Sequence, residues 1–238
     1  ILTLRIANIL QTASVDSENI LCLTYTESGA RTMKERLARF IGEKESRKVN
    51  ISTFHGFCMR LREEYGEYFE KKTLASDIEK VKILKTVLES HDDLYWICSE
   101  SNKLANIGDI LRSISEYKRE RNTLEYIKSQ SDSLESYLST AKNTYEAEKA
   151  RGIKRGFTFN QTKINEIERK SKKLSEFFTV AKEYDKKLKE KNLCDFDDLI
   201  NDVVDKLKSV FEFSRSVQEK YQYILVDEFQ DTNTAQNE

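Results

Sequence analysis

Two adjacent carboxylates near the C-terminus, Asp227 and Glu228, have the residue types and the position expected of a catalytic site. They directly follow the apolar run 223–226, which is rich in strand-forming residues, and Gln230 comes two positions later. A carboxylate at the end of a buried strand is costly to desolvate unless it meets a cation or a hydrogen-bond donor. Mg²⁺ prefers one or two carboxylates together with water and phosphate oxygens. We therefore interpret Asp227 as a magnesium ligand and Glu228 as the group that orients or deprotonates an attacking water, in preference to a solvated turn.

Two other segments place hydroxyl and aromatic side chains where strands are expected to end. Hydroxyls and strand-end amides can hold phosphates without reading a base sequence, and an aromatic ring can stack on any base. Taken singly, such residues are more often ordinary β structure, core aromatics or a structural histidine. The six strand-end residues are Thr24, Tyr25, Thr26, Thr53, Phe54 and His55.

The first part of the chain alternates strand and helix patterns. Short apolar runs predict strands at 20–26 and 49–54, and apolar residues at helical spacing predict helices at 1–10, 30–41 and 57–69. This alternation favours a parallel α/β sheet.

The pattern changes near Thr73, where Ser76 and Glu79 form an expected capping box. From there to about residue 191 nearly every segment is predicted to be helical, with a loop or short hairpin over 151–162. A helix over 196–207 and a final strand then resume the α/β pattern. We expect an α/β domain that is interrupted by a largely helical insertion. The expected parts are residues 1–72, 73–191 and 192–238.

Composition narrows the class of protein. The chain has 38% hydrophobic and 34% charged residues, no proline and seven glycines, which favours a helix-rich folded protein. The four cysteines form no CxxC pair and are expected to be reduced and buried. His55 and His91 lack a second imidazole or thiolate at ligand spacing, which argues against zinc. No apolar run of about 20 residues and no cleavable leader is present, so we expect neither membrane insertion nor secretion.

The net charge of −1 hides a local asymmetry. Residues 145–191 carry 14 Lys/Arg against 8 Asp/Glu, and residues 192–238 carry 4 against 11. This division suits a polyanion on one region and a cation in the other, although surface helices often carry unmatched charge.

Four segments are informative when taken together: 227–231 (DEFQD), 23–26 (LTYT), 52–58 (STFHGFC) and 195–199 (DFDDL). Together they resemble the UvrD/Rep/PcrA group of superfamily 1 DNA helicases. The first three are similar to helicase motifs II, Ia and Ib, and the fourth is similar to the element that leads back into the motor domain. The segments occur in family order over most of the chain. The resemblance implies an incomplete RecA-like parallel-sheet motor domain, part of domain 1A, interrupted by the helical domain 1B.

The resemblance also implies an activity: an ATP-dependent DNA helicase, of 3′ to 5′ polarity by family analogy, acting in DNA repair or replication. ATP and Mg²⁺ are the implied cofactors, with Asp227 positioning Mg²⁺, Glu228 acting as general base and Gln230 sensing the γ-phosphate. The six strand-end residues would line the track of single-stranded DNA. The basic helices of the insertion would meet duplex junctions. DNA-repair proteins are further expected partners, and the cytoplasm is the expected location.

Three acids of the DFDDL segment have a simpler interpretation. Asp195, Asp197 and Asp198 precede or begin the expected helix, and acids favour the positive end of a helix. We expect them to cap that helix rather than to act in catalysis.

Two features depart from the helicase pattern. After Thr26 the family usually has Asn-Lys-Ala-Ala, whereas this chain has Glu27-Ser28-Gly29-Ala30, and a carboxylate there repels phosphate. No glycine is followed by lysine, so the phosphate-binding GxxxxGK(S/T) loop is absent from these residues. We expect the 238 residues to be a fragment that lacks ATPase activity by itself. Two alternatives stay open: a subunit of a RecB/AddA-type helicase-nuclease, and a non-catalytic module that binds DNA or a repair partner.

Overall fold

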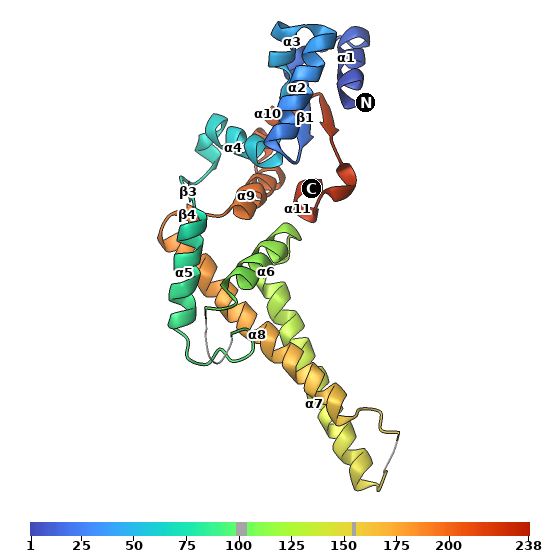
Figure 1. The fold of residues 1–238 in the computed structure, drawn as a ribbon, viewed down its shortest axis with the longest axis vertical. Helices are drawn as coiled ribbons and strands as arrows, with labels where there is room; N and C mark the ends of the chain where they lie inside the picture. The colour runs from blue at the N-terminus through green and yellow to red at the C-terminus, as the bar shows by residue number, and fades with distance from the viewer. Residues whose placement is uncertain (99–103, 154–155) are drawn as a thin grey trace. The chain divides into compact units, whose positions relative to one another are not determined.

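The chain forms two compact units in a computed structural model that describes residues 1–98, 104–153 and 156–238. Unit 1 contains residues 1–72 and 195–238, and unit 2 contains residues 73–194. In Figure 1, unit 1 takes the two ends of the colour range, and unit 2 takes the green-to-orange middle. The chain therefore leaves unit 1, builds unit 2 and returns. The two units are described separately.

Unit 1 is built around a small parallel sheet. Its strands are β1 (Ile20–Thr24), β2 (Asn50–Thr53) and β5 (Tyr223–Val226), in the order β2-β1-β5. Thr24 lies opposite Thr53, and Leu23 lies opposite Val226, so all three strands end at the same edge. β1 is buried along its whole length because it is the central strand. The expected parallel α/β sheet is confirmed.

Helices cover this sheet. Ile6, Cys22 and Leu37, from α1, β1 and α2, are completely buried in one core. Gly42 ends α2 with φ of 84°, a conformation that glycine adopts without steric cost. The helices of unit 1 are α1 (Leu2–Thr12), α2 (Glu27–Ile41), α3 (Glu43–Lys48), α4 (Phe54–Glu64), α9 (Phe196–Ser209), α10 (Phe211–Lys220) and α11 (Thr234–Asn237), with short 3₁₀ turns at Ser17–Asn19, Gly66–Tyr68 and Phe229–Asp231.

An aromatic cluster joins the two chain segments of unit 1. Phe213 on α10 is completely buried, and its ring lies 5.2, 5.7 and 5.4 Å from the rings of Tyr65, Tyr68 and Phe69. The prediction that one helix runs to Phe69 is wrong, since α4 ends at Glu64 and a 3₁₀ turn follows. The helix ends where Gly66 follows Tyr65, since glycine disfavours a helix interior.

Unit 2 is almost entirely helical, as expected. The capping box of Ser76 and Glu79 is confirmed at the start of α5. The main core gathers around Leu84, Ile114 and Tyr184, from α5, α6 and α8. The elements of unit 2 are β3 (Thr73–Leu74), α5 (Asp77–Glu89), α6 (Ile107–Arg119), α7 (Leu124–Ala150), α8 (Gln161–Glu190) and β4 (Leu193–Cys194).

The helices α7 and α8 form a long antiparallel pair, visible in Figure 1. A second, smaller core of Leu138, Ala141 and Ile164 lies along this pair. The loop predicted over 151–162 is shorter, because α8 already begins at Gln161. Residues 154 and 155 of that prediction lie outside the described residues.

A buried lysine in unit 2 forms an ion pair. Lys118 on α6 is only 4% exposed, and its Nζ lies 2.9 Å from Oδ1 of Asp185 on α8. The hydroxyl of Tyr117 donates to the other carboxylate oxygen at 2.7 Å. Burying a charge is costly unless it is paired, so each of these charges depends on the other.

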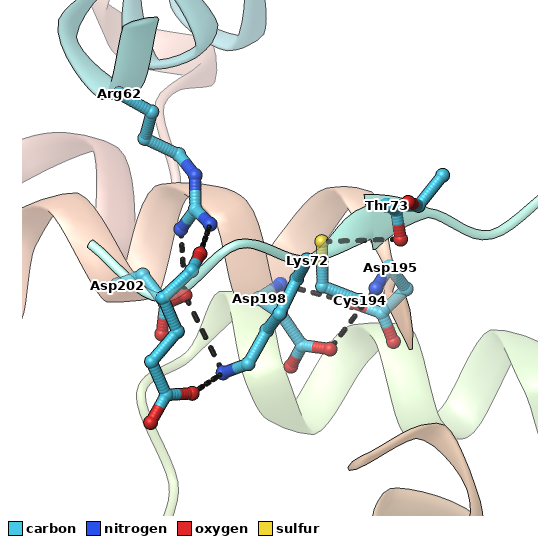
Figure 2. Close-up of polar contacts among 8 residues, drawn as sticks. Arg62, Lys72, Thr73, Cys194, Asp195, Asp198 and Asp202 are labelled. Carbon is cyan, nitrogen blue, oxygen red and sulfur yellow. Dashed lines mark hydrogen bonds and ion pairs between the residues drawn. The ribbon is translucent and has the colours of Figure 1, made fainter. Parts of the chain in front are cut away.

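The two segments that connect the units run next to each other. In unit 2, β3 and β4 pair in parallel, with Thr73 opposite Leu193. On the unit 1 side, Figure 2 shows Arg62 and Lys72 directed at Asp202. The Arg62–Asp202 distance is 2.7 Å.

Lys72 is held by more than one carboxylate. Its Nζ lies 2.9 Å from Glu70 and 3.9 Å from Asp202. Burial acts to lower the pKa of Lys72, but the bond to Glu70 and the charge of Asp202 outweigh it and raise this pKa. Lys72 therefore stays charged, and the end of the outgoing segment is fixed to the returning helix α9.

Candidate functional site

The edge where β1, β2 and β5 end gathers the residues singled out in the sequence. The backbone N–H of Asp227 donates to the carbonyl of Leu23 at 2.8 Å, which continues the β1–β5 pairing by one residue. Asp227 is half-buried. Burial, followed by the negative charge of Asp227, raises the pKa of the Cys22 thiol to about 12. The thiol therefore stays protonated beneath the edge and does not act as a nucleophile.

Glu228 adopts a backbone conformation that is unusual for its residue type. Its φ is 49° and its ψ 46°, in the left-handed region. Non-glycine residues adopt this region at a cost and cluster at functional sites when they do. The exposed Glu228 side chain accepts a hydrogen bond from Nε2 of Gln230 at 2.5 Å. This turn therefore holds the carboxylate and the amide of the DEFQD segment together.

The hydroxyls of Thr26 and Thr53 cap the N-termini of two helices. Oγ1 of Thr26 accepts from the N–H of Gly29 at 2.9 Å at the start of α2, and Oγ1 of Thr53 accepts from the N–H of Gly56 at 3.0 Å at the start of α4. Gly29 has no room for a side chain, because a Cβ there would lie 2.9 Å from Oγ1 of Thr24. The two helix N-termini therefore stand side by side at the edge, each with a threonine cap.

An aromatic contact joins the two hydroxyl-bearing segments. The rings of Tyr25 and Phe54 lie 5.7 Å apart; Phe54 is buried, whereas Tyr25 is 37% exposed. The Tyr25 hydroxyl donates to Oε1 of Gln236 at 3.3 Å. Partial burial, with the charge of Asp231 second, raises the pKa of Tyr25. Tyr25 therefore presents a neutral ring at the edge.

The six strand-end residues differ in accessibility. Tyr25 and Thr26 are exposed, and His55 is half-buried, with its ring edge-on to that of Phe196 at 5.1 Å. The buried members are Thr24, Thr53 and Phe54. The structure thus brings all six to one edge but makes only half of them accessible, and DNA contact by any of them stays a prediction.

The acids of this edge suit a magnesium ion whose coordination shell is completed by other ligands. Among residues 1–98, 104–153 and 156–238, no three His, Cys, Asp or Glu side chains are grouped so as to hold a metal by themselves. Mg²⁺ needs only one or two carboxylates when water and phosphate oxygens supply the remainder. A single half-buried carboxylate at a strand end, as Asp227 is, fits that requirement.

Two contacts at this edge were not predicted from the sequence. The carboxylate of Glu27 accepts a hydrogen bond from the hydroxyl of Thr53 at 2.8 Å. Gln236 contacts Tyr25 from the short helix α11, whose capping box with Asn233 has a recognisable spacing that could have predicted the helix. The prediction that the DFDDL acids cap a helix is confirmed for Asp195 and Asp198, which form a capping box at α9 (Figure 2).

The fold and this edge define a class of protein. A parallel sheet with carboxylates and hydroxyls gathered at its carboxyl edge, interrupted by a helical insertion, is an incomplete RecA-like helicase domain. The sequence matches the UvrD/REP helicase N-terminal domain over residues 1–238, and the chain belongs to that family.

Two curated relatives of this chain have names that describe DNA helicases. A Bacillus subtilis protein named ATP-dependent DNA helicase PcrA is 32% identical over 240 residues, which cover 99% of this chain and 26% of the relative. A Mycoplasma pneumoniae protein named probable DNA helicase II homolog is 28% identical over 238 residues, covering 100% of this chain and 28% of the relative. The chain thus spans about a quarter of the length of these relatives.

Within the described part of the chain, no helix is both long enough and apolar enough to cross a lipid bilayer.

Proposed function

We propose that this chain contributes part of the first motor domain of an ATP-dependent DNA helicase, which couples ATP hydrolysis to 3′ to 5′ movement on single-stranded DNA and to duplex unwinding in repair or replication. Unit 1 would be the motor part and unit 2 the inserted domain 1B. The observation that carries the proposal is the common edge of β1, β2 and β5. Residues suited to phosphate, base and magnesium binding end three neighbouring strands there. The family and the names of the relatives support it.

On the nucleotide side of this edge, we assign Asp227 to Mg²⁺, Glu228 to the general base and Gln230 to sensing of the γ-phosphate. The left-handed turn at Glu228 and its bond to Gln230 support the assignment, because they keep the two side chains together. Mg²⁺, when bound with ATP, neutralises charge on the phosphates. Glu228 would then orient the attacking water and accept its proton.

On the DNA side, the accessible groups are the Tyr25 ring and the Thr26 hydroxyl, with His55 partly accessible. An exposed ring supports stacking on any base, as a sequence-neutral motor requires. Thr24 and Phe54 would lie beneath the track, because their side chains are buried. The buried Thr53 would meet a phosphate only where its hydroxyl is released by Glu27.

In unit 2, we propose that the basic helices meet duplex junctions through phosphates, so that binding weakens as salt rises. DNA-repair proteins are proposed as further partners. A cytoplasmic location is proposed because reducing conditions would keep the four buried free cysteines as thiols.

Replacement of the proposed base tests this function. In the full-length protein, Glu228→Gln should keep ATP binding and lower DNA-stimulated hydrolysis by roughly 100-fold or more, since a positioned base contributes about 10²–10⁴-fold. The matched control is Glu212→Gln, an exposed acid on α10. Hydrolysis near the original rate in Glu228→Gln would contradict the assignment of the base.

The missing phosphate-binding loop provides a second arm of the same experiment. The isolated 238 residues should hydrolyse no ATP with or without DNA, because they contain no GxxxxGK(S/T) sequence. DNA-stimulated turnover by this segment alone would contradict the proposal.

A further inference from the structure

The Glu27 side chain uses the only hydroxyl proton of Thr53. Oγ1 of Thr53 lies 2.8 Å from Oε1 of Glu27, and a carboxylate can only accept, so the threonine is the donor. The same Oγ1 already accepts from the N–H of Gly56. Thr53 has one O–H to give, and while Glu27 holds it Thr53 cannot donate to a phosphate.

Glu27 also lies where an external anion would be attracted. Thr26 and Thr53 cap α2 and α4, so the positive ends of two helices meet at this edge. Backbone N–H groups at a helix N-terminus favour phosphate. Oε1 of Glu27 lies only 3.7 Å from the position that a Cβ on Gly56 would occupy, in the first turn of α4. The chain thus supplies its own anion to this position.

The neighbouring groove does not compensate for this negative charge. A cavity of about 690 Å³ between α2 and α4 is lined by three acids and three bases: Glu27, Glu35, Glu63, Arg31, Lys34 and Arg60. One of the bases is already engaged, because the Arg60 guanidinium donates to Asn50 at 2.9 Å and to Ser52 at 3.0 Å. The groove therefore has no excess of positive charge to draw a phosphate past Glu27.

We propose that Glu27 is a positioning residue that weakens the hold of this edge on DNA, because its carboxylate competes with a DNA phosphate for the Thr53 hydroxyl and the adjoining helix N-termini. The inference rests on the proposed DNA-binding function. It concerns single-stranded DNA bound through its backbone, since the competition is between two anions. The exposure of Glu27 lets it move aside or be replaced without disturbing the core.

The test is binding of the full-length protein, without nucleotide, to a fluorescent oligothymidylate over a range of salt concentrations. Glu27→Gln removes the charge and leaves a neutral amide oxygen, which is a weaker acceptor for the Thr53 hydroxyl than a carboxylate. It should bind about 5-fold more tightly at low salt, the change expected for one like-charge contact near 4 Å in water. The gain in affinity should shrink as salt rises, because salt screens the like-charge repulsion that the substitution removes.

Two variants separate competition from a general charge effect. Glu63→Gln makes the same charge change in the same groove on an exposed residue, and should alter affinity by less than about 2-fold because it lies farther from the strand-end edge. Glu27→Asp keeps the charge and should bind like the original protein with an unchanged salt slope. Thermal melting of all variants should agree, which shows that differences in affinity do not arise from unfolding.

The outcomes distinguish this inference from the proposed function. Binding by the original protein with no gain in Glu27→Gln over Glu63→Gln would overturn the role of Glu27 and leave DNA binding intact. Failure of every variant to bind the oligonucleotide would overturn the proposed function and, with it, this inference.

Discussion

The two units bring their residues into contact in different ways. In unit 1, strands that are distant in sequence end at one edge, so residues near 24, 53 and 227 meet although they lie far apart along the chain. In unit 2, most contacts join helices that follow one another, above all α7 and α8. The candidate chemistry lies in the unit whose topology brings distant segments together.

This difference has a physical basis. The ends of parallel strands present side chains and free backbone groups on a rigid edge, where a ligand can reach several segments at once. A helical pair presents long surfaces but no such convergence, and its stability depends on stripes of apolar packing and on occasional buried polar pairs. Three substitutions can break or sharpen this comparison.

The largest effect is expected in unit 1 from Phe213→Ala. Loss of a fully buried phenyl ring that is surrounded by three aromatic rings should lower the free energy of unfolding by about 3–5 kcal/mol. Hydrogen exchange should accelerate in unit 1 more than in unit 2. The matched control is Phe211→Ala, two residues earlier on the same helix, where the ring is 73% exposed and the expected loss is small. Equal losses in the two variants would show that the aromatic cluster does not join the two segments of unit 1.

A somewhat smaller effect is expected in unit 2 from Lys118→Met. Methionine keeps most of the buried apolar part of the lysine side chain but leaves Asp185 without its counter-charge. The free energy of unfolding should fall by about 3 kcal/mol. Urea unfolding measures the loss, and exchange should accelerate in α6 and α8. Lys189→Met removes an exposed charge from α8 and serves as the control. If both lysine variants unfold at the same urea concentration, the buried pair does not stabilise unit 2.

The smallest effect is expected at the boundary from Asp195→Ala. The Asp195 side chain accepts from the N–H of Asp198 at 2.9 Å, and loss of an N-cap costs about 1 kcal/mol. Asp195→Asn retains a capping oxygen and should lose much less stability, which separates capping from charge. Faster exchange confined to α9 would support a local cap. Faster exchange throughout unit 2 would instead show that this cap couples the two units, contrary to the comparison drawn above.

Much of the fold could be predicted because local patterns agree with the final packing. The strands β1, β2 and β5 are apolar runs of the right length, and the capping boxes at Ser76 and Asp195 have a recognisable spacing. The short helix α3 was not predicted, because its residues Glu43–Lys48 are all polar and offer no apolar periodicity. The strands β3 and β4 were also missed, since two residues carry no pattern and form a strand only through a partner distant in sequence.

The candidate site was predictable in part for the same reason. Motif resemblance and residue type located the DEFQD carboxylates and the strand-end hydroxyls. The sequence could not reveal that Thr53 and Phe54 are buried or that Glu27 binds Thr53, because these depend on the register between β1 and β2 and on how each side chain turns. A sequence motif fixes which groups are present, whereas their hydrogen-bonding partners are decided by tertiary structure.

The short β3–β4 pair has a consequence for how such a protein can change over evolution. Its two strands bring the entry and the exit of a 122-residue segment, Thr73–Cys194, next to each other. From a strand spacing of about 4.8 Å and a rise of about 3.3 Å per residue, the two ends lie within roughly 6 Å. A segment with adjacent ends can be gained, shortened or exchanged at the gene level without changing the strand order of the sheet into which it is inserted. The edge formed by β1, β2 and β5 and the inserted helices are therefore free to diverge at different rates.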